Sequence, residues 1–333
     1  MTFRERYMMG DTEFDEIFDL TGKWNFSDDP RTLREYLGLT AREEDVWISE
    51  SDEALEELME KERNTKIFFT DLDGTLLDDE KHISAGNQQA IDELLHRGHV
   101  VVISTGRALA SAKIQAQRLG LTKENCYIIC FNGGQVYDAY HQKLIYQKSV
   151  PMEYVRTVFD WARDFGISVQ TYSDTHVISE TDNEQLHAYS LMQKIPCQVA
   201  DDITKALPHD PAKILVLDFD RPDRVQEFRD SIRDWCQGKL DIFLSHPSLL
   251  EMVSPGVSKG SAVRFLCDYL GIPIANSVAA GDAENDLPMI EACGIGAVMC
   301  NGEQQLKNKA DYVTEADNNH DGVAEILRKF VLK

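Results

Sequence analysis

Two aspartates stand two residues apart in the pentapeptide Asp-Leu-Asp-Gly-Thr of residues 71–75. The pentapeptide follows residues 67–69, an apolar run with β-branched and aromatic side chains, and this order predicts a buried strand that leads into a tight turn. Asp71 and Asp73 would then lie at the carboxyl end of a strand, where open α/β sheets bind ligands. Two close carboxylates suit a divalent cation, or a nucleophile that works with a general acid. Because acidic turns with glycine are also common on protein surfaces, this interpretation depends on partners elsewhere in the chain.

Two further segments carry groups that can hold a phosphate oxygen. Thr105 and Gly106 follow an apolar run at residues 100–104, so a hydroxyl and a backbone N–H would lie at the start of a helix. By itself, this segment is also typical of an ordinary helix N-cap. Lys259 lies in the first turn of another predicted helix, where a cation opposes the helix macrodipole. An isolated lysine is usually a solvated surface charge, whereas this unfavourable placement favours an anionic partner.

An acidic segment follows the apolar residues 278–280. It contains Asp282, Glu284, Asn285 and Asp286. Three carboxylates and an amide at the tip of a buried strand suit a hard cation, and the alternative is an acidic helix N-terminus. Because the segments are placed around one expected sheet, they are predicted to meet at one edge and to form a common site for phosphate chemistry.

Alternating strand and helix patterns position these segments from residue 65 onward. Strands are predicted at residues 67–70, 100–104, 127–131, 278–281 and 295–299. Helices are predicted at residues 84–97, 108–119, 259–270, 287–292 and 322–332. Continuous apolar strands of this kind indicate a parallel sheet that is covered by helices on both faces.

The middle of the chain, residues 143–252, has shorter strands of mixed polarity that are interleaved with helices. This pattern indicates an α+β domain with a half-exposed sheet. The sequence therefore predicts an α/β fold: a doubly wound, Rossmann-like core of residues 65–142 and 253–333, interrupted by an inserted α+β domain of residues 143–252.

Residues 1–64 differ from the rest of the chain in charge. They hold nineteen Asp or Glu residues against eight Lys or Arg residues, a net charge of −11. Apolar residues recur at helical spacing, as at Phe14, Ile17 and Phe18, so we expect a small, mainly helical, acidic extension. Such an extension either covers the surface of the main domain or binds a partner.

Composition excludes several classes of function. The 333 residues are 43% hydrophobic and carry a formal net charge of −23, which argues against nucleic acid or an anionic membrane as a partner. Neither a membrane span nor a secretory signal is expected. The seven scattered cysteines lack any Cys-x-x-Cys pair, so we expect reduced thiols and a cytoplasmic location. An anionic substrate would need a metal ion or a local cationic pocket.

The four segments, read in chain order, are similar to the signature of the haloacid dehalogenase superfamily: Asp-x-Asp-Gly-Thr, Thr-Gly-Arg, Lys-Gly and Gly-Asp-x-x-Asn-Asp. Three further segments resemble its Cof-type branch, which carries a type IIB cap: Phe-Asn-Gly-Gly at 131–134, Gly-Val-Ser-Lys-Gly at 256–260 and Asp-Gly-Val-Ala at 321–324. The resemblance covers residues 65–333, and residues 1–64 fall outside it. The inserted domain is then expected to be the cap that closes over the site.

This resemblance implies a role for each acidic group. Asp71 would attack phosphorus and form an aspartyl-phosphate, and Asp73 would be the general acid for the leaving group and then the general base for water. Mg2+ would be bound by Asp71, by the backbone carbonyl of Asp73 and by Asp282. Asp286 would orient Lys259 or a metal-bound water.

The resemblance also implies phosphate-binding groups and candidate cap residues. Thr105, Gly106 and Lys259 would hold the transferring phosphoryl oxygens, and Asn285 would add a donor. Arg107 is expected either to contact the substrate or to pair with a nearby carboxylate. Candidate cap residues, not assigned to the site, are Tyr172, His176, His187 and Lys213.

The resulting prediction is a Mg2+-dependent phosphatase that acts on a small phosphomonoester, such as a sugar phosphate or a phosphorylated cofactor. The resemblance also implies that an acid at position 73 favours hydrolysis of a phosphomonoester over dehalogenation, because dehalogenases of the superfamily lack an acid there. Two alternatives stay open at this point: a phosphomutase of the same superfamily, and a non-catalytic phospholigand sensor or scaffold that acts through residues 1–64. The sequence does not indicate which oligomeric state the protein has.

Overall fold

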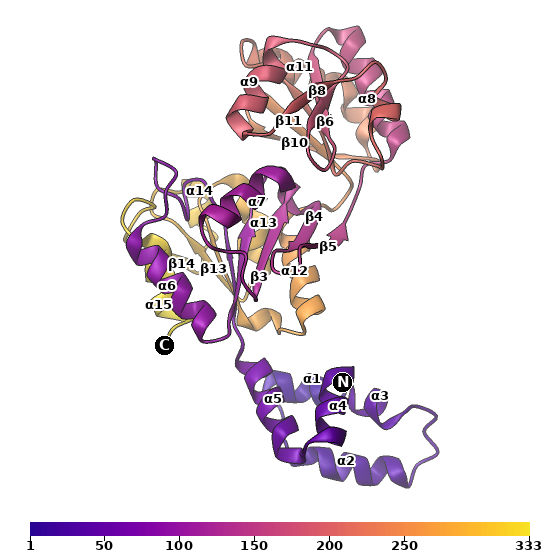
Figure 1. Ribbon diagram of the computed structural model, residues 1–333, viewed down its shortest axis with the longest axis vertical. Coiled ribbons are helices and arrows are strands. Elements are labelled where there is room, and N and C mark those ends of the chain that lie inside the picture. The colour runs from indigo at the N-terminus through magenta and orange to yellow at the C-terminus, as the bar shows by residue number, and fades with distance from the viewer.

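The computed structural model describes residues 1–333 as three parts along the long axis of the molecule (Figure 1). The middle part, which we call the core, is a sheet with helices on both faces. The residues between β5 (Lys143–Gln147) and α12 (Lys259–Leu270) form a second part, the cap. Residues 1–64 form a third part, the N-terminal module, at the end of the core that lies away from the cap. The α/β fold predicted from the sequence is confirmed.

The core sheet contains eight strands: β1 (Ile67–Thr70), β2 (Val100–Ser104), β3 (Cys126–Cys130), β4 (Gln135–Asp138), β5, β12 (Ser277–Gly281), β13 (Ile295–Val298) and β14 (Tyr312–Val313). Their order is β14-β13-β12-β1-β2-β3-β4-β5, and the strands from β14 to β3 are parallel. Every residue of β1, β2 and β12 is buried, as expected for parallel strands with helices on both faces. Ligand-binding loops are therefore expected at the carboxyl ends of these central strands.

Helices cover both faces of this sheet. Their bounds are α6 (Ala85–His96), α7 (Leu109–Arg118), α12, α13 (Leu287–Ala292), α14 (Gln304–Lys307) and α15 (Gly322–Phe330), with the short 3-10 helices η1 (Phe131–Gly133), η2 (Ile274–Asn276) and η3 (Glu284–Asp286). Apolar residues of α6, α7 and α15 pack in one hydrophobic cluster, and those of α12 and α13 pack in another with the opposite side of the strands. No helix in the structure is long and apolar enough to cross a membrane.

The cap is a second sheet backed by helices. Its strands are β6 (Ser168–Tyr172), β7 (Val177–Ser179), β8 (Cys197–Val199), β9 (Lys213–Leu217), β10 (Asp241–His246) and β11 (Leu249–Val253), in the order β10-β11-β9-β6-β7-β8. Its helices are α8 (Met152–Phe165), α9 (Glu184–Gln193), α10 (Ile203–Ala206) and α11 (Pro222–Cys236). The apolar faces of α8 and α11 pack with Ile214 and Val216 of the central strand β9.

The predicted boundaries of the inserted domain need correction at both ends. β5, at residues 143–147, pairs with β4 and so belongs to the core sheet. It is an edge strand whose residues are exposed or half-buried, and its mixed polarity therefore resembled that of the cap strands. At the other end, Val253 pairs with Lys213 inside the cap sheet.

The N-terminal module packs around a hydrophobic core of its own. Its helices are α1 (Phe3–Met9), α2 (Glu16–Asn25), α3 (Leu33–Leu37), α4 (Ala41–Ser49) and α5 (Asp52–Asn64). Threonine–glutamate capping boxes start α1, α3 and α4. Nine buried apolar residues, including Phe3, Ile17 and Leu55, form one cluster that contains no residue of the core or the cap. The module therefore does not simply spread over the surface of the core.

We predict that Leu55→Ala destabilises the N-terminal module and leaves catalysis unchanged. Leu55 is fully buried, so its truncation should cost about 2–5 kcal/mol of unfolding free energy. Hydrogen exchange of residues 1–64 and kcat/KM for an aryl phosphate would measure the two effects. Glu57→Ala, at an exposed position of the same helix, is the control. A matching loss of kcat/KM in Leu55→Ala would show that the module supports the catalytic site.

Candidate active site

A buried lysine joins two aspartates that come from distant segments of the chain. The Nζ atom of Lys259 lies 2.6 Å from Oδ1 of Asp71 and 2.5 Å from Oδ1 of Asp286. Lys259 and Asp286 are fully buried. Because burial of an ammonium group is costly unless it is paired, these contacts fix the start of α12 against the ends of β1 and β12.

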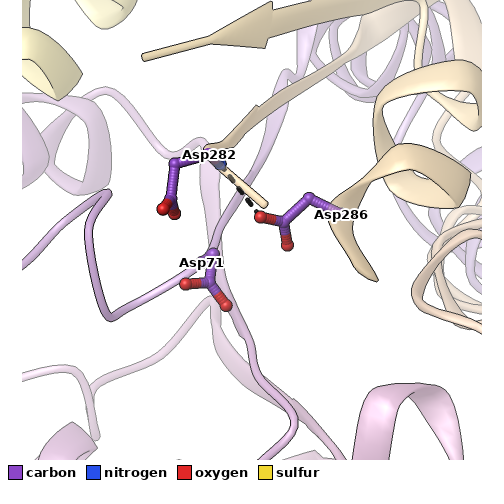
Figure 2. Close-up of side chains that lie close together, drawn as sticks. All are labelled: Asp71, Asp282 and Asp286. Atoms are coloured by element: carbon purple, nitrogen blue, oxygen red, sulfur yellow. Dashed lines mark hydrogen bonds between the residues drawn. The ribbon is translucent and has the colours of Figure 1, made fainter. Parts of the chain in front are cut away.

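Three carboxylates converge at this point, as Figure 2 shows. One oxygen from each of Asp71, Asp282 and Asp286 lies within 4.8 Å of the others. The second oxygen of Asp286 accepts hydrogen bonds from the backbone N–H groups of Asp282 (3.0 Å) and Ala283 (3.1 Å). Asp286 is thus held by Lys259 and by the backbone, whereas Asp71 and Asp282 keep oxygens for another ligand.

The turn after β1 depends on a glycine. The backbone N–H of Asp71 donates to the carbonyl of Ala280, which extends the pairing of β1 with β12 by one residue. Gly74 then has a φ of +85°, and a Cβ atom there would lie 2.5 Å from Oδ2 of Asp282. Thr75 donates through Oγ1 to Oδ1 of Asp282 at 2.7 Å. The turn therefore brings the two carboxylate-bearing segments together only if residue 74 lacks a side chain.

Burial and mutual repulsion shift the titration of these acids. Burial raises the pKa of Asp71 to about 8, and Asp286 and Asp282 act in the same direction, against the opposing effect of Lys259. Burial likewise raises the pKa of Asp282 to about 6. The pKa of Lys259 is raised because Asp286 and Asp71 together outweigh the opposing effect of burial. The cluster has more carboxylates than cations, so a divalent cation would fit the charge and the oxygen donors present.

Asp73 points to two cationic side chains outside this cluster. Its Oδ2 lies 2.7 Å from Nη2 of Arg107, and its Oδ1 lies 2.8 Å from Nζ of Lys81. Burial alone would raise the pKa of Asp73, but the two cations outweigh it and hold the pKa below its usual range. Of the two roles expected for Arg107, the structure shows pairing with a carboxylate.

Thr105 and Gly106 belong to the phosphate loop, which we define as residues 104–107. Thr105 is buried, and its Oγ1 accepts a hydrogen bond from the backbone N–H of Arg107 at 3.2 Å. The Oδ1 atom of Asn132 lies close to Gly106: a Cβ atom added to Gly106 would be 3.0 Å from it. The same Oδ1 accepts from Nδ2 of Asn285 at 3.3 Å. Asn132 thus links the phosphate loop to the loop after β12.

Asn132 is a candidate site residue that our residue-level prediction missed. Its Nδ2 is buried and has no hydrogen-bond partner in the protein. Its backbone is left-handed, with a φ of 54°, and a Cβ atom on the next residue, Gly133, would lie 2.1 Å from the carbonyl oxygen of Ser258. The Asn-Gly-Gly sequence was the available signal, since it combines residues that tolerate this conformation.

A cavity of about 520 Å³ lies between the cap and the core loops that carry Asn132, Lys259 and Asn285. Lys259, Asn132 and Asn285 line it from the core, and Arg229, Phe243 and Ser245 line it from the cap. Among the candidate cap residues, Lys213 and Tyr172 are buried. His187 is exposed and pairs with Asp182, and His176 contacts Thr175. None of these four candidate residues lines the cavity. The space beside Lys259 is therefore large enough for a small molecule.

Comparisons with known proteins agree with this geometry. A family model described as haloacid dehalogenase-like hydrolase matches residues 68–327. A 5-amino-6-(5-phospho-D-ribitylamino)uracil phosphatase of Bacillus subtilis is 30% identical over 267 residues, which cover 80% of this chain and 96% of that protein. The HMP-PP phosphatase of Cronobacter sakazakii is 30% identical over 241 residues, covering 71% of this chain and 84% of that protein.

Solved structures share the fold. A haloacid dehalogenase-like hydrolase of Bacteroides thetaiotaomicron has a TM-score of 0.74 and 27% identity, covering 80% of this chain and 99% of that one. The solved structure of a subclass IIB sugar phosphatase has a TM-score of 0.66 and 21% identity, covering 81% of this chain and 100% of that one. At this identity the similarity shows a shared fold only. With the loops of the core, the inserted cap and these relatives taken together, the chain belongs to the haloacid dehalogenase-like hydrolases of the Cof type, and it is a phosphatase of phosphoric monoesters.

Proposed function

We propose that this phosphatase is Mg2+-dependent and transfers the phosphoryl group of its substrate to Asp71 before water releases it. The observation that carries the proposal is the buried contact of Lys259 with Asp71 and Asp286, beside the carboxylate of Asp282. This arrangement gives a carboxylate a fixed position next to a buried cation. A carboxylate held in this way can act as a nucleophile.

In the first step, an oxygen of Asp71 forms a bond to phosphorus, and the bond from phosphorus to the leaving oxygen breaks. The phosphoryl group is then an acyl phosphate on Asp71. Two anions must approach each other for this step, and the ammonium of Lys259, 2.6 Å from Oδ1 of Asp71, reduces their repulsion. In the second step, the oxygen of a water molecule bonds to phosphorus, the bond to Asp71 breaks, and inorganic phosphate leaves.

The donor set suits Mg2+, which prefers oxygen ligands and retains several waters. The carboxylates of Asp71 and Asp282 and the backbone carbonyl of Asp73 would hold the ion, while Asp286 keeps its contacts with Lys259 and the backbone. When bound, the ion would neutralise part of the charge on the phosphoryl oxygens.

Asp73 would move the protons. It would give a proton to the leaving oxygen and later take one from the attacking water. The pair with Arg107 and Lys81 keeps Asp73 ionised, which suits the second of these tasks. The first task requires release from these cations, because burial would then raise the pKa of the carboxyl group.

The phosphoryl oxygens would be held by groups on three loops. Lys259, the hydroxyl of Thr105 and the backbone N–H of Gly106 would contact them, and Asn285 would add a donor. Asn132 supports this assignment, because its unpartnered Nδ2 is buried beside the phosphate loop. A phosphate oxygen would supply the acceptor that this amide lacks in the protein.

The leaving group would lie in the cavity of about 520 Å³ against the cap. This volume suits a small phosphorylated metabolite. The two relatives named above as phosphatases point in the same direction, because their names describe a phosphorylated ribitylaminouracil and HMP-PP. A sugar phosphate or a phosphorylated cofactor is therefore our proposed substrate class. No feature of the structure favours a mutase or a non-catalytic sensor over this function.

We predict that Asp71→Asn abolishes turnover of an aryl phosphate, because an amide oxygen is a poor nucleophile. Asp73→Asn should lower kcat by about 10²–10⁴-fold, the usual contribution of a general acid–base group. Steady-state kinetics with saturating Mg2+ would measure both effects. Asp268→Asn, an exposed position on α12, is the matched control and should retain full activity. Full activity in Asp71→Asn would contradict the proposed mechanism.

We also predict that Mg2+ binds more tightly as the pH rises from 6 to 8. The raised pKa values of Asp71 (about 8) and Asp282 (about 6) mean that the metal-free site holds protons, which must leave when the ion binds. Affinity should increase roughly tenfold per pH unit for each proton released. Calorimetry in buffers of different ionisation enthalpy would measure the affinity and the proton release.

Asp282→Asn replaces one proposed carboxylate ligand with a neutral amide and should weaken Mg2+ binding at every pH, whereas Asp268→Asn should not. An affinity for Mg2+ that is independent of pH, or unchanged in Asp282→Asn, would exclude this carboxylate cluster as the binding site.

A further inference from the structure

Lys213, the first residue of β9, is a buried cation at the boundary between the cap and the core. Its side chain is 1% exposed. Its Nζ donates a hydrogen bond to the carbonyl oxygen of Gly106 in the phosphate loop, at 3.3 Å. The ammonium also lies 5.6 Å from the ring centre of Phe131, which follows β3, and 5.1 Å from that of Tyr172 in the cap. One cap side chain therefore contacts two loops of the catalytic site.

Glu251 on the neighbouring strand β11 keeps this lysine charged. Its Oε2 lies 2.7 Å from Nζ of Lys213, and its side chain is 5% exposed. The pKa of Lys213 is raised, because Glu251 and other neighbours outweigh the lowering effect of burial. A buried ion pair is seldom more stabilising than apolar residues of similar size. Stability alone therefore does not explain why the Lys213–Glu251 pair lies against a loop of the catalytic site.

A chain of contacts connects the same pair to the cavity. Oε1 of Glu251 accepts a hydrogen bond from the hydroxyl of Ser245 at 2.8 Å. Ser245 lines the cavity that Lys259 and Asn285 line from the opposite side. Three successive contacts thus lead from the cavity wall to the phosphate loop: Ser245 to Glu251, Glu251 to Lys213, and Lys213 to Gly106. Gly106 is the residue whose backbone N–H we assign to the phosphoryl group.

We propose that Lys213, held by Glu251, is a positioning residue that ties phosphoryl binding to closure of the cap. It secures Gly106 from the cap side, so the phosphate loop has its binding conformation when the cap is closed. By linkage, a phosphate that selects this conformation must in turn favour the closed cap. The inference rests on the proposed function, because it needs Gly106 to contact the phosphoryl group.

The test measures binding of inorganic phosphate to the full chain in the presence of Mg2+, together with the change in radius of gyration that phosphate causes. Lys213→Met alone leaves Glu251 buried without its partner and could fail to fold. The informative protein is therefore the double variant Lys213→Met with Glu251→Gln, which removes both charges and keeps similar volumes. Lys205→Met, at an exposed ion pair of the cap, is the control.

The double variant should unfold at a temperature similar to that of the wild type but bind phosphate about 10- to 100-fold more weakly, the range expected for loss of a charge-assisted contact. Its radius of gyration should no longer decrease on adding phosphate, whereas that of the wild type and of Lys205→Met should. A folded double variant with wild-type phosphate affinity and compaction would overturn the inference and leave the proposed function intact. A wild-type protein that neither binds phosphate nor turns over an aryl phosphate would instead contradict the proposed function, and the inference with it.

Discussion

The site depends on one buried ammonium group. Lys259 is fully buried, and its ammonium donates hydrogen bonds to the carboxylates of Asp71 and Asp286 in place of the water that it loses. A group of this kind is stable only when its partners are placed accurately, so the pairing restricts how α12 approaches the ends of β1 and β12. Two glycines make that approach possible: a Cβ atom on Gly260 would lie 2.1 Å from the carbonyl of Pro288, and one on Gly281 would lie 2.5 Å from Cβ of Asp286.

The same constraint resolves an apparent contradiction between the charge of the chain and that of its substrate. A protein of net charge −23 should repel a phosphate dianion. Nearly half of this charge is on residues 1–64, which lie at the end of the core away from the cap. Around the cavity, by contrast, Lys259 from the core and Arg229 from the cap bring cationic groups. Local charge, supplemented in our proposal by Mg2+, therefore decides which ligand the site accepts.

Much of the fold and part of the site could be predicted from the sequence, because both depend on local signals. The strand before Asp71 and the strand before Asp282 are short apolar runs, and parallel pairing then brings their ends together. Other features depend on contacts between distant residues. The pairing of Lys213 with Glu251 joins separate strands of the cap, and the two cations on Asp73 come from different loops. The boundary at residue 143 was wrong because an edge strand of the core has the mixed polarity of a half-exposed sheet.

The central claim is that the phosphoryl group is transferred twice, first to Asp71 and then to water. The stereochemical course at phosphorus tests it most directly, with a phosphorothioate substrate whose phosphorus is chiral through sulfur, 16O and 18O, hydrolysed in water labelled with 17O. Each in-line displacement inverts the configuration, so two successive displacements predict overall retention in the inorganic thiophosphate released. Overall inversion would show a single direct transfer to water and would contradict the account.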